Sequence, residues 1–170
     1  MINSDIETPE VDMANYLTIV ALEDGLTAKL SLNECYYSVD GGEWVLLGAD
    51  TYTPEINIGQ KLYFKGEITP SSSGSGTFTI TKSCNLEGNC MSLLYGDYAK
   101  NKKFKYSHTR AFYYLFAGNN GIIEVSDDFL PSNNTVSNCY DHMFNKCSNL
   151  IKAPRLNAME MSYRCYYFMF

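Results

Sequence analysis

Hydrophobic and polar residues alternate in short runs between residues 15 and 95, which is the pattern of half-buried β-strands. In residues 26–32 the leucines share one face, while Thr27, Lys29 and Ser31 occupy the other. Similar runs cover residues 16–22, 36–39, 43–47, 61–65 and 77–81, and the Asp-Gly-Gly of 40–42 predicts a hairpin. About seven strands at intervals of roughly ten residues predict an antiparallel, Ig-like β-sandwich over residues 14–96, with Trp44 as its core anchor.

A different rhythm begins after residue 108, where one hexapeptide occurs three times. The copies are AFYYLF at 111–116, CYDHMF at 139–144 and CYYFMF at 165–170, offset by 28 and 26 residues. Positions one, two, five and six are small or Cys, aromatic, Leu or Met, and Phe, whereas positions three and four vary. On a helical turn, residues i, i+1, i+4 and i+5 share a face, so the constant positions are predicted to point inward and the variable pair outward.

An extended segment follows each of the first two copies, at residues 122–125 and 150–156. One helical turn and one short strand every 26–28 residues predict a short leucine-rich-repeat solenoid over residues 110–170. The predicted fold is therefore mainly β with short helical turns. A flexible extension at 1–13 precedes the sandwich, and a basic linker at 97–109 joins it to the incomplete repeat array.

The repeat sequence resembles a known family. The run CYDHMFNKCSNLIKAP at 139–154, taken up again by RCYYFMF at 164–170, resembles BspA-like leucine-rich repeats. The preceding segments look like the β leader that precedes such repeats in proteins of gut anaerobes and their phages: ALEDG at 21–25, YSVDG at 37–41, KLYFKG at 61–66 and GNCMSLLYG at 88–96. This resemblance implies surface exposure and binding to proteins or glycans, without catalysis.

The variable positions of the repeats are the candidate binding residues. Sequence freedom beside constant core positions is typical of solvent-facing sites, and aromatic side chains there supply contact area. The predicted contact residues are the variable pairs and two strand-facing cations: Tyr113, Tyr114, Asp141, His142, Tyr167, Phe168, Lys152 and Arg155.

Neither a catalytic centre nor a metal or cofactor site is predicted. The six cysteines form no CxxC pair, and Cys139, Cys147 and Cys165 fall at repeat positions, where free thiols pack as small hydrophobic groups. Cys139 and His142 are three residues apart and offer one thiol–imidazole candidate. The repeat alignment places Cys139 inward and His142 outward, which argues against that pair.

Charge and hydropathy narrow the partners. A net charge of −6 is the opposite of what phosphate-backbone binding requires, so no nucleic acid is expected, and the lysines of 100–105 are interpreted as a solvated linker. No apolar run is long enough for membrane insertion. The first ten residues lack the basic and apolar regions of a secretory signal.

Three functional hypotheses follow. The first is a phage virion component, as a fibre, tail or capsid decoration, assembled in the host cytoplasm. The second is a bacterial cell-surface adhesin, and the third is the non-catalytic part of a hydrolase. The sequence stops in mid-repeat at Phe170, so we expect either a longer natural chain or coverage by other protein subunits, through self-association or docking onto a larger assembly. A bacterial surface protein or glycan is the further expected partner.

Overall fold

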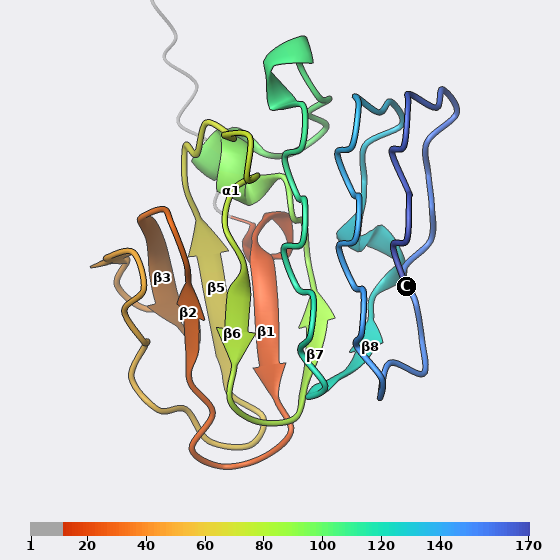
Figure 1. Ribbon diagram of the computed structural model, residues 1–170. Helices are drawn as coiled ribbons and strands as arrows, with labels where there is room; N and C mark the ends of the chain where they lie inside the picture. Colours follow the sequence, from red (N-terminus) through yellow and green to blue (C-terminus); the bar gives the residue numbers. More distant parts are fainter. Residues whose placement is uncertain (1–11) are drawn as a thin grey trace, which may run out of the picture.

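Short strands carry the fold in residues 12–170, the part of the chain that the computed structural model describes (Figure 1). The strands are β1 (Leu17–Ala21), β2 (Ala28–Leu30), β3 (Cys35–Val39), β4 (Val45–Leu47), β5 (Lys61–Lys65), β6 (Phe78–Ile80), β7 (Cys84–Glu87) and β8 (Ile122–Val125). Helix α1 (Ser92–Tyr95) has one turn, and 3-10 turns occur at η1 (Met13–Asn15), η2 (Gly96–Tyr98), η3 (Tyr106–His108) and η4 (Asp127–Phe129). The predicted mainly β class is confirmed. Most of the predicted extension at 1–13 lies outside the described residues.

The strands form a mixed six-stranded sheet and a two-stranded sheet. The order in the large sheet is β4-β3-β5-β1-β7-β8, and β3 and β4 form the predicted hairpin. The pair β2–β6 packs over this sheet, where Phe78 of β6 meets Phe64 of β5 edge to face at 5.0 Å. The strand pairs within residues 14–96 are antiparallel, as the sequence predicted, whereas β8, which lies beyond that range, pairs with β7 in parallel. The long connection between them, which contains the first hexapeptide, permits this crossover.

The hexapeptides are not helical, contrary to the sequence prediction. Their fourth residues, Tyr114, His142 and Phe168, have φ of 55°, 56° and 44°, in the left-handed region. A right-handed helix cannot contain such a residue at every fourth position, so the chain runs through successive turns instead. The predicted division into inward and outward positions is nevertheless largely right. Successive four-residue turns place almost the same residues on one side as a helix of 3.6 residues per turn does.

Backbone hydrogen bonds stack the three copies as layers, here residues 110–118, 138–146 and 164–170. Alternate N–H groups of one layer donate to carbonyls of the next: Phe112 to Cys139 at 2.8 Å and Phe144 to Met169 at 2.8 Å. The intervening N–H groups fold back within their own layer, as that of Tyr113 does to Arg110 at 3.2 Å. The N–H groups that point to the next layer and those that point back into their own layer therefore both find acceptors without any helix.

The β domain, here residues 12–96, covers the side of the first layer that faces away from the second layer. The N–H groups of Ser75 and Phe78 donate to the carbonyls of Ala111 and Leu115 at 3.2 and 2.7 Å. Ser75 belongs to the glycine-rich loop at residues 70–76 and is fully buried in this contact. The loop holds the layers on the β2–β6 sheet.

The constant hexapeptide positions form the core of the layers. In the first two copies all of them are buried: Ala111, Phe112, Leu115, Phe116, Cys139, Tyr140, Met143 and Phe144. In the third copy Cys165 and Met169 are buried, whereas Phe170 is 54% exposed. A row of rings leads from the sheet into the layers, with successive centroid distances of 5.0, 5.3, 5.6 and 6.0 Å along Phe64, Phe78, Phe116, Phe144 and Phe170.

Sheet and core are thus continuous across the predicted boundary between residues 14–96 and 110–170.

Two local predictions need correction. The segment 97–109 is not a solvated linker throughout, because Phe104 is buried against Phe112 and Tyr140. Trp44 is only partly buried; it lies beside Tyr16 and is not a core anchor, since the core is filled by side chains from the strands and layers.

Gly76 tests the close backbone contact with Ser31, and Gly59 is its control. An alanine Cβ at Gly76 would lie 1.9 Å from the carbonyl oxygen of Ser31, whereas at Gly59 nothing lies within 4 Å. Both have positive φ, of +101° and +83°. We expect Gly59→Ala to lower the free energy of unfolding by about 1–2 kcal/mol and Gly76→Ala by roughly 2 kcal/mol more. Urea denaturation measures both, and equal losses would show that the contact does not constrain the fold.

Candidate binding surface on the stacked hexapeptides

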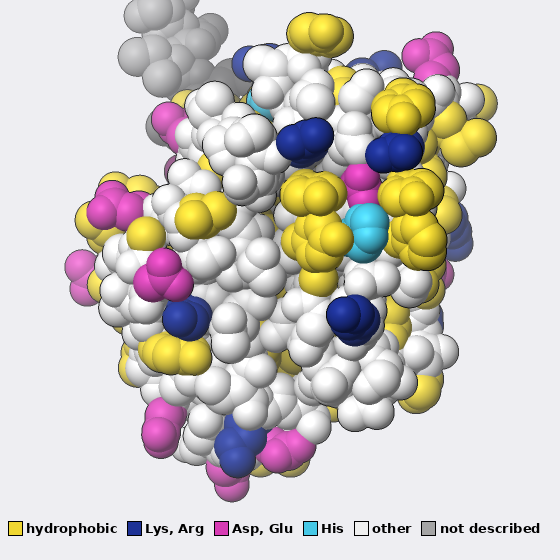
Figure 2. Space-filling view, viewed as in Figure 1, with side chains coloured by type: hydrophobic (Ala, Val, Ile, Leu, Met, Phe, Trp, Pro, Cys, Tyr) yellow, Lys and Arg dark blue, Asp and Glu magenta, His cyan; other side chains and the backbone are white. Residues whose placement is uncertain are grey.

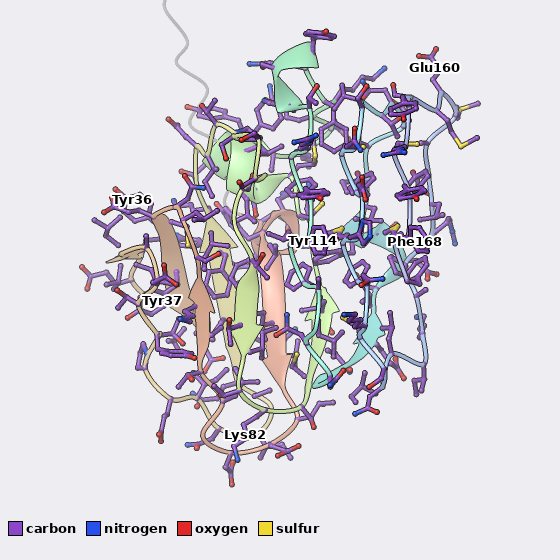
Figure 3. All side chains as sticks on the ribbon, in the orientation of Figure 1. Tyr36, Tyr37, Lys82, Tyr114, Glu160 and Phe168 are labelled. Carbon is purple, nitrogen blue, oxygen red and sulfur yellow. The ribbon has the colours of Figure 1, made fainter. Side chains whose placement is uncertain are left out.

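The variable positions bring three rings into one column on the outside of the layers. His142 stacks on Tyr114 with centroids 4.5 Å apart and an interplanar angle of 10°, and on Phe168 at 5.4 Å and 28°. Each ring comes from the fourth position of a different copy. Figure 3 shows Tyr114 and Phe168 on the same side of the first and third layers. The in-register ladder therefore aligns residues that are 28 and 26 positions apart in sequence.

A second set of side chains widens this column. The ring of Tyr113 lies edge-on to Tyr114 at 4.5 Å, and Tyr167 lies edge-on to Phe168 at the same distance. Arg110 lies 5.6 Å from the ring centre of Tyr113, and Arg164 lies 4.7 Å from that of Tyr167. In Figure 2 two groups of hydrophobic side chains flank the central histidine, with basic side chains next to them. We call this set the aromatic face: Arg110, Tyr113, Tyr114, His142, Arg164, Tyr167 and Phe168.

The sequence predicted Asp141 as an outward contact residue, but in the structure its side chain is buried. It is 3% exposed, accepts a hydrogen bond from the Asn138 amide at 2.6 Å, and pairs with Nδ1 of His142. A carboxylate this close to the backbone stack is buried because its polar partners satisfy it there. Its structural effect is to hold the His142 ring between its two aromatic neighbours.

Lys152 and Arg155 are exposed, but the structure does not place them on the aromatic face. Both approach Asp127, at 3.9 and 3.5 Å, beside β8. In residues 12–170, no hydrogen bond, ion pair or ring contact joins them to the column. The extended segment that carries them runs next to β8, with Val125 N–H donating to the Lys152 carbonyl at 2.9 Å. Exposed ion pairs of this kind contribute little to stability.

The arginines of the aromatic face were missed by the sequence analysis. Arg110 and Arg164 immediately precede the first and third hexapeptides, and Asn138 precedes the second. All three have positive φ, so the position before each copy repeats the geometry of the fourth position. Extending the alignment by one residue would have found them.

Cys139 and Cys165 occupy the first position of the second and third hexapeptides and are buried in the core of the layers. All six cysteines are free and buried, which confirms the prediction for Cys139, Cys147 and Cys165. Burial raises the pKa of Cys139 to about 12 and that of Cys147 to about 11, so both are protonated at neutral pH. Cys139 faces the core while His142 stacks outside, and the two do not form a thiolate–imidazolium pair.

The aromatic face can bind through ring stacking, apolar contact and arginine hydrogen bonds. Among residues 12–170 no group of three or more His, Cys, Asp or Glu side chains is placed to hold a metal ion. No helix in the same range is long and apolar enough to cross a membrane.

Comparison with protein-family models, with curated proteins and with solved structures found no match to this chain.

The buried thiols give a direct test of the layer core. We expect iodoacetamide to leave all six cysteines unmodified in the native protein at neutral pH, because burial blocks access and keeps those with raised pKa protonated. The same reagent in denaturant, without reductant, should label all six. Mass spectrometry counts the adducts. Labelling of Cys139 in the native state would show that the layers open readily.

Tyr140 tests the packing between layers. Its ring stacks between Phe112 and Tyr166, at 5.8 and 5.5 Å, while its buried hydroxyl has no hydrogen-bond partner among the described residues. An unsatisfied buried hydroxyl is destabilising. We therefore expect Tyr140→Phe to raise the free energy of unfolding by about 1 kcal/mol, and Tyr140→Ala to lower it by about 3–5 kcal/mol. Urea denaturation distinguishes the two, and a loss on Tyr140→Phe would show that the hydroxyl is bonded.

Proposed function

We propose that this chain is a non-enzymatic attachment protein, a virion component of a phage, that binds a protein or glycan of a bacterial cell through its aromatic face. The same proposal assigns residues 110–170 to a short leucine-rich-repeat solenoid of the BspA-like type, behind a β-sandwich leader. Two features support that assignment. Each of the first two copies is followed by an extended segment, and these segments meet side by side at the parallel bridge between Glu124 and Lys152.

The observation that carries the proposed function is the ordered aromatic column itself. Aromatic residues and arginine are the side chains most enriched at the energetic centres of protein interfaces. Here Tyr167 and Phe168 are 41% and 59% exposed, although soluble domains normally bury rings of this size. Because the column stands on a hydrogen-bonded ladder, a partner would order few additional side chains on binding, which lowers the entropic cost.

The free thiols favour the virion over the exported adhesin. Exported proteins mature in oxidising compartments, where neighbouring cysteines tend to form disulfides. All six cysteines of this chain are free, a state that suits assembly inside a reducing cytoplasm. The adhesin is the second candidate, and the aromatic face would serve it in the same way.

Location separates these candidates. Antibodies raised against the purified chain should label phage particles in electron micrographs of the source culture. Labelling of the bacterial envelope in cells free of phage would favour the adhesin instead.

Binding tests the aromatic face. We expect the double variant Tyr167→Ser/Phe168→Asn to weaken binding of the labelled protein to intact cells of the source bacterium by about tenfold or more. Asn is chosen at 168 because it tolerates the left-handed backbone. The melting temperature should hardly change, since both side chains are exposed. Flow cytometry measures binding.

Tyr106→Ser is the matched control, because Tyr106 is 92% exposed and contributes nothing to the aromatic face. It should bind like the unmodified protein. Equal binding by all three proteins would overturn the proposed role of the face.

A further inference from the structure

A second group of exposed aromatic side chains surrounds a hollow at one end of the large sheet. Tyr36 of β3 and Lys65 of β5 are register partners and therefore share a face of the sheet. Phe64, next to Lys65, points to the opposite face, where it meets Phe78 of the two-stranded sheet. The hollow consequently lies on the outer face, and Figure 3 shows Tyr36 far from Tyr114 and Phe168.

The hollow measures about 420 Å³ and has three aromatic walls. Tyr36 and Tyr98 are 45% and 56% exposed, and Trp44 is partly buried beside them. A volume of this size is typical of small-molecule sites. Trp44 was expected in the core on sequence grounds, and its position here leaves the only tryptophan of the chain at the surface.

Two of the charged side chains at the hollow, Lys65 and Asp97, are held by hydrogen bonds. The Lys65 ammonium donates to Asp97 at 2.7 Å and lies 4.3 Å from the ring centre of Trp44. The Tyr16 hydroxyl donates to the same carboxylate oxygen at 2.8 Å. Partial burial alone would raise the pKa of Asp97, but the hydrogen bonds from Lys65 and Tyr16 outweigh it and lower this pKa. Asp97 is thus an ionised acceptor with one oxygen, Oδ1, already engaged.

The chemistry of these groups selects among ligands. Aromatic faces attract polarised C–H groups, and the ammonium and carboxylates can donate to and accept from hydroxyls. Lys65 opposes Asp97 and Glu67, which leaves one net negative charge at the hollow, so an anionic ligand is repelled. A cationic ligand would have to displace Lys65 from its place over Trp44. A neutral polyhydroxyl ring meets neither obstacle.

We propose that this hollow binds a neutral sugar unit of a polysaccharide, with the pyranose ring against the exposed rings of Tyr36 or Tyr98, beside Trp44, and its hydroxyls on Lys65, Asp97 and Glu67. This site is separate from the aromatic face, and it does not depend on the proposed attachment function.

The single tryptophan makes the test specific. Emission from selectively excited tryptophan reports on Trp44 alone, and the probes are neutral trisaccharides of glucose, mannose and galactose. We expect at least one to shift this emission saturably at millimolar concentration. Tyr36→Ala and Tyr98→Ala, on different walls, should each weaken that response by about tenfold with unchanged melting temperature. Either variant suffices if the other fails to fold.

Control variants separate this site from the aromatic face. Tyr106→Ala and Tyr167→Ser/Phe168→Asn should both retain the Trp44 response, even though the latter is expected to lose cell binding. No response to any of the three neutral sugars would overturn the proposal. So would an equal response to trigalacturonate or choline, or a response that survives in both Tyr36→Ala and Tyr98→Ala.

Discussion

The hydrogen-bond ladder between the layers is the interaction on which the rest of this structure depends. Every second N–H group of a layer reaches the next layer, as Phe116 does to Met143 at 2.9 Å, and the others close turns within their own layer. This arrangement requires left-handed backbone at bulky residues such as Tyr114, at a cost of about 1–2 kcal/mol each. Burial of the constant hexapeptide positions and the hydrogen bonds between layers offset this cost.

Register in the ladder also determines where the side chains lie. Equivalent positions of successive copies are placed over one another, so aromatic residues at those positions form stacked rows. Phe116 and Phe144 stack inside at 5.6 Å, while Tyr114 and His142 stack outside at 4.5 Å. The inner row gives the layers their core, and the outer row gives the molecule an exposed aromatic surface. One backbone pattern thus produces both stability and a candidate binding face.

The layers and the β domain form a single packed unit. The first layer receives hydrogen bonds from Ser75 and Phe78, and β8 extends the large sheet beside β7. This attachment places the two candidate surfaces far apart, with the aromatic face on the layers and the Trp44 hollow on the outer face of the sheet. The two surfaces also differ in chemistry: arginines flank the first, whereas carboxylates and one lysine line the second.

Local pattern in the sequence determined most of the strands and the sides of the repeats. The alternation at 26–32, the turn at 40–42 and the period of the hexapeptides depend only on near neighbours, which is why they could be read directly. The repeat pattern did not distinguish a helical turn from a run of period-four turns, because both bury positions one, two, five and six. Only the backbone hydrogen bonds between layers, which form in the tertiary structure, favour the turns over a helix.

Contacts between distant residues decided the remainder. Asp141 is buried because Asn138 and His142 satisfy it in the folded stack. Lys152 and Arg155 lie away from the aromatic face because the segment that carries them pairs with β8. Trp44 lies at the surface because β3, β4 and β5 place it beside Tyr16 and under Lys65, residues remote from it in sequence. Composition predicts that a tryptophan is usually buried, but which side of a sheet it occupies depends on strand pairing. That pairing is a property of the tertiary structure, because each partner is supplied by a different part of the chain.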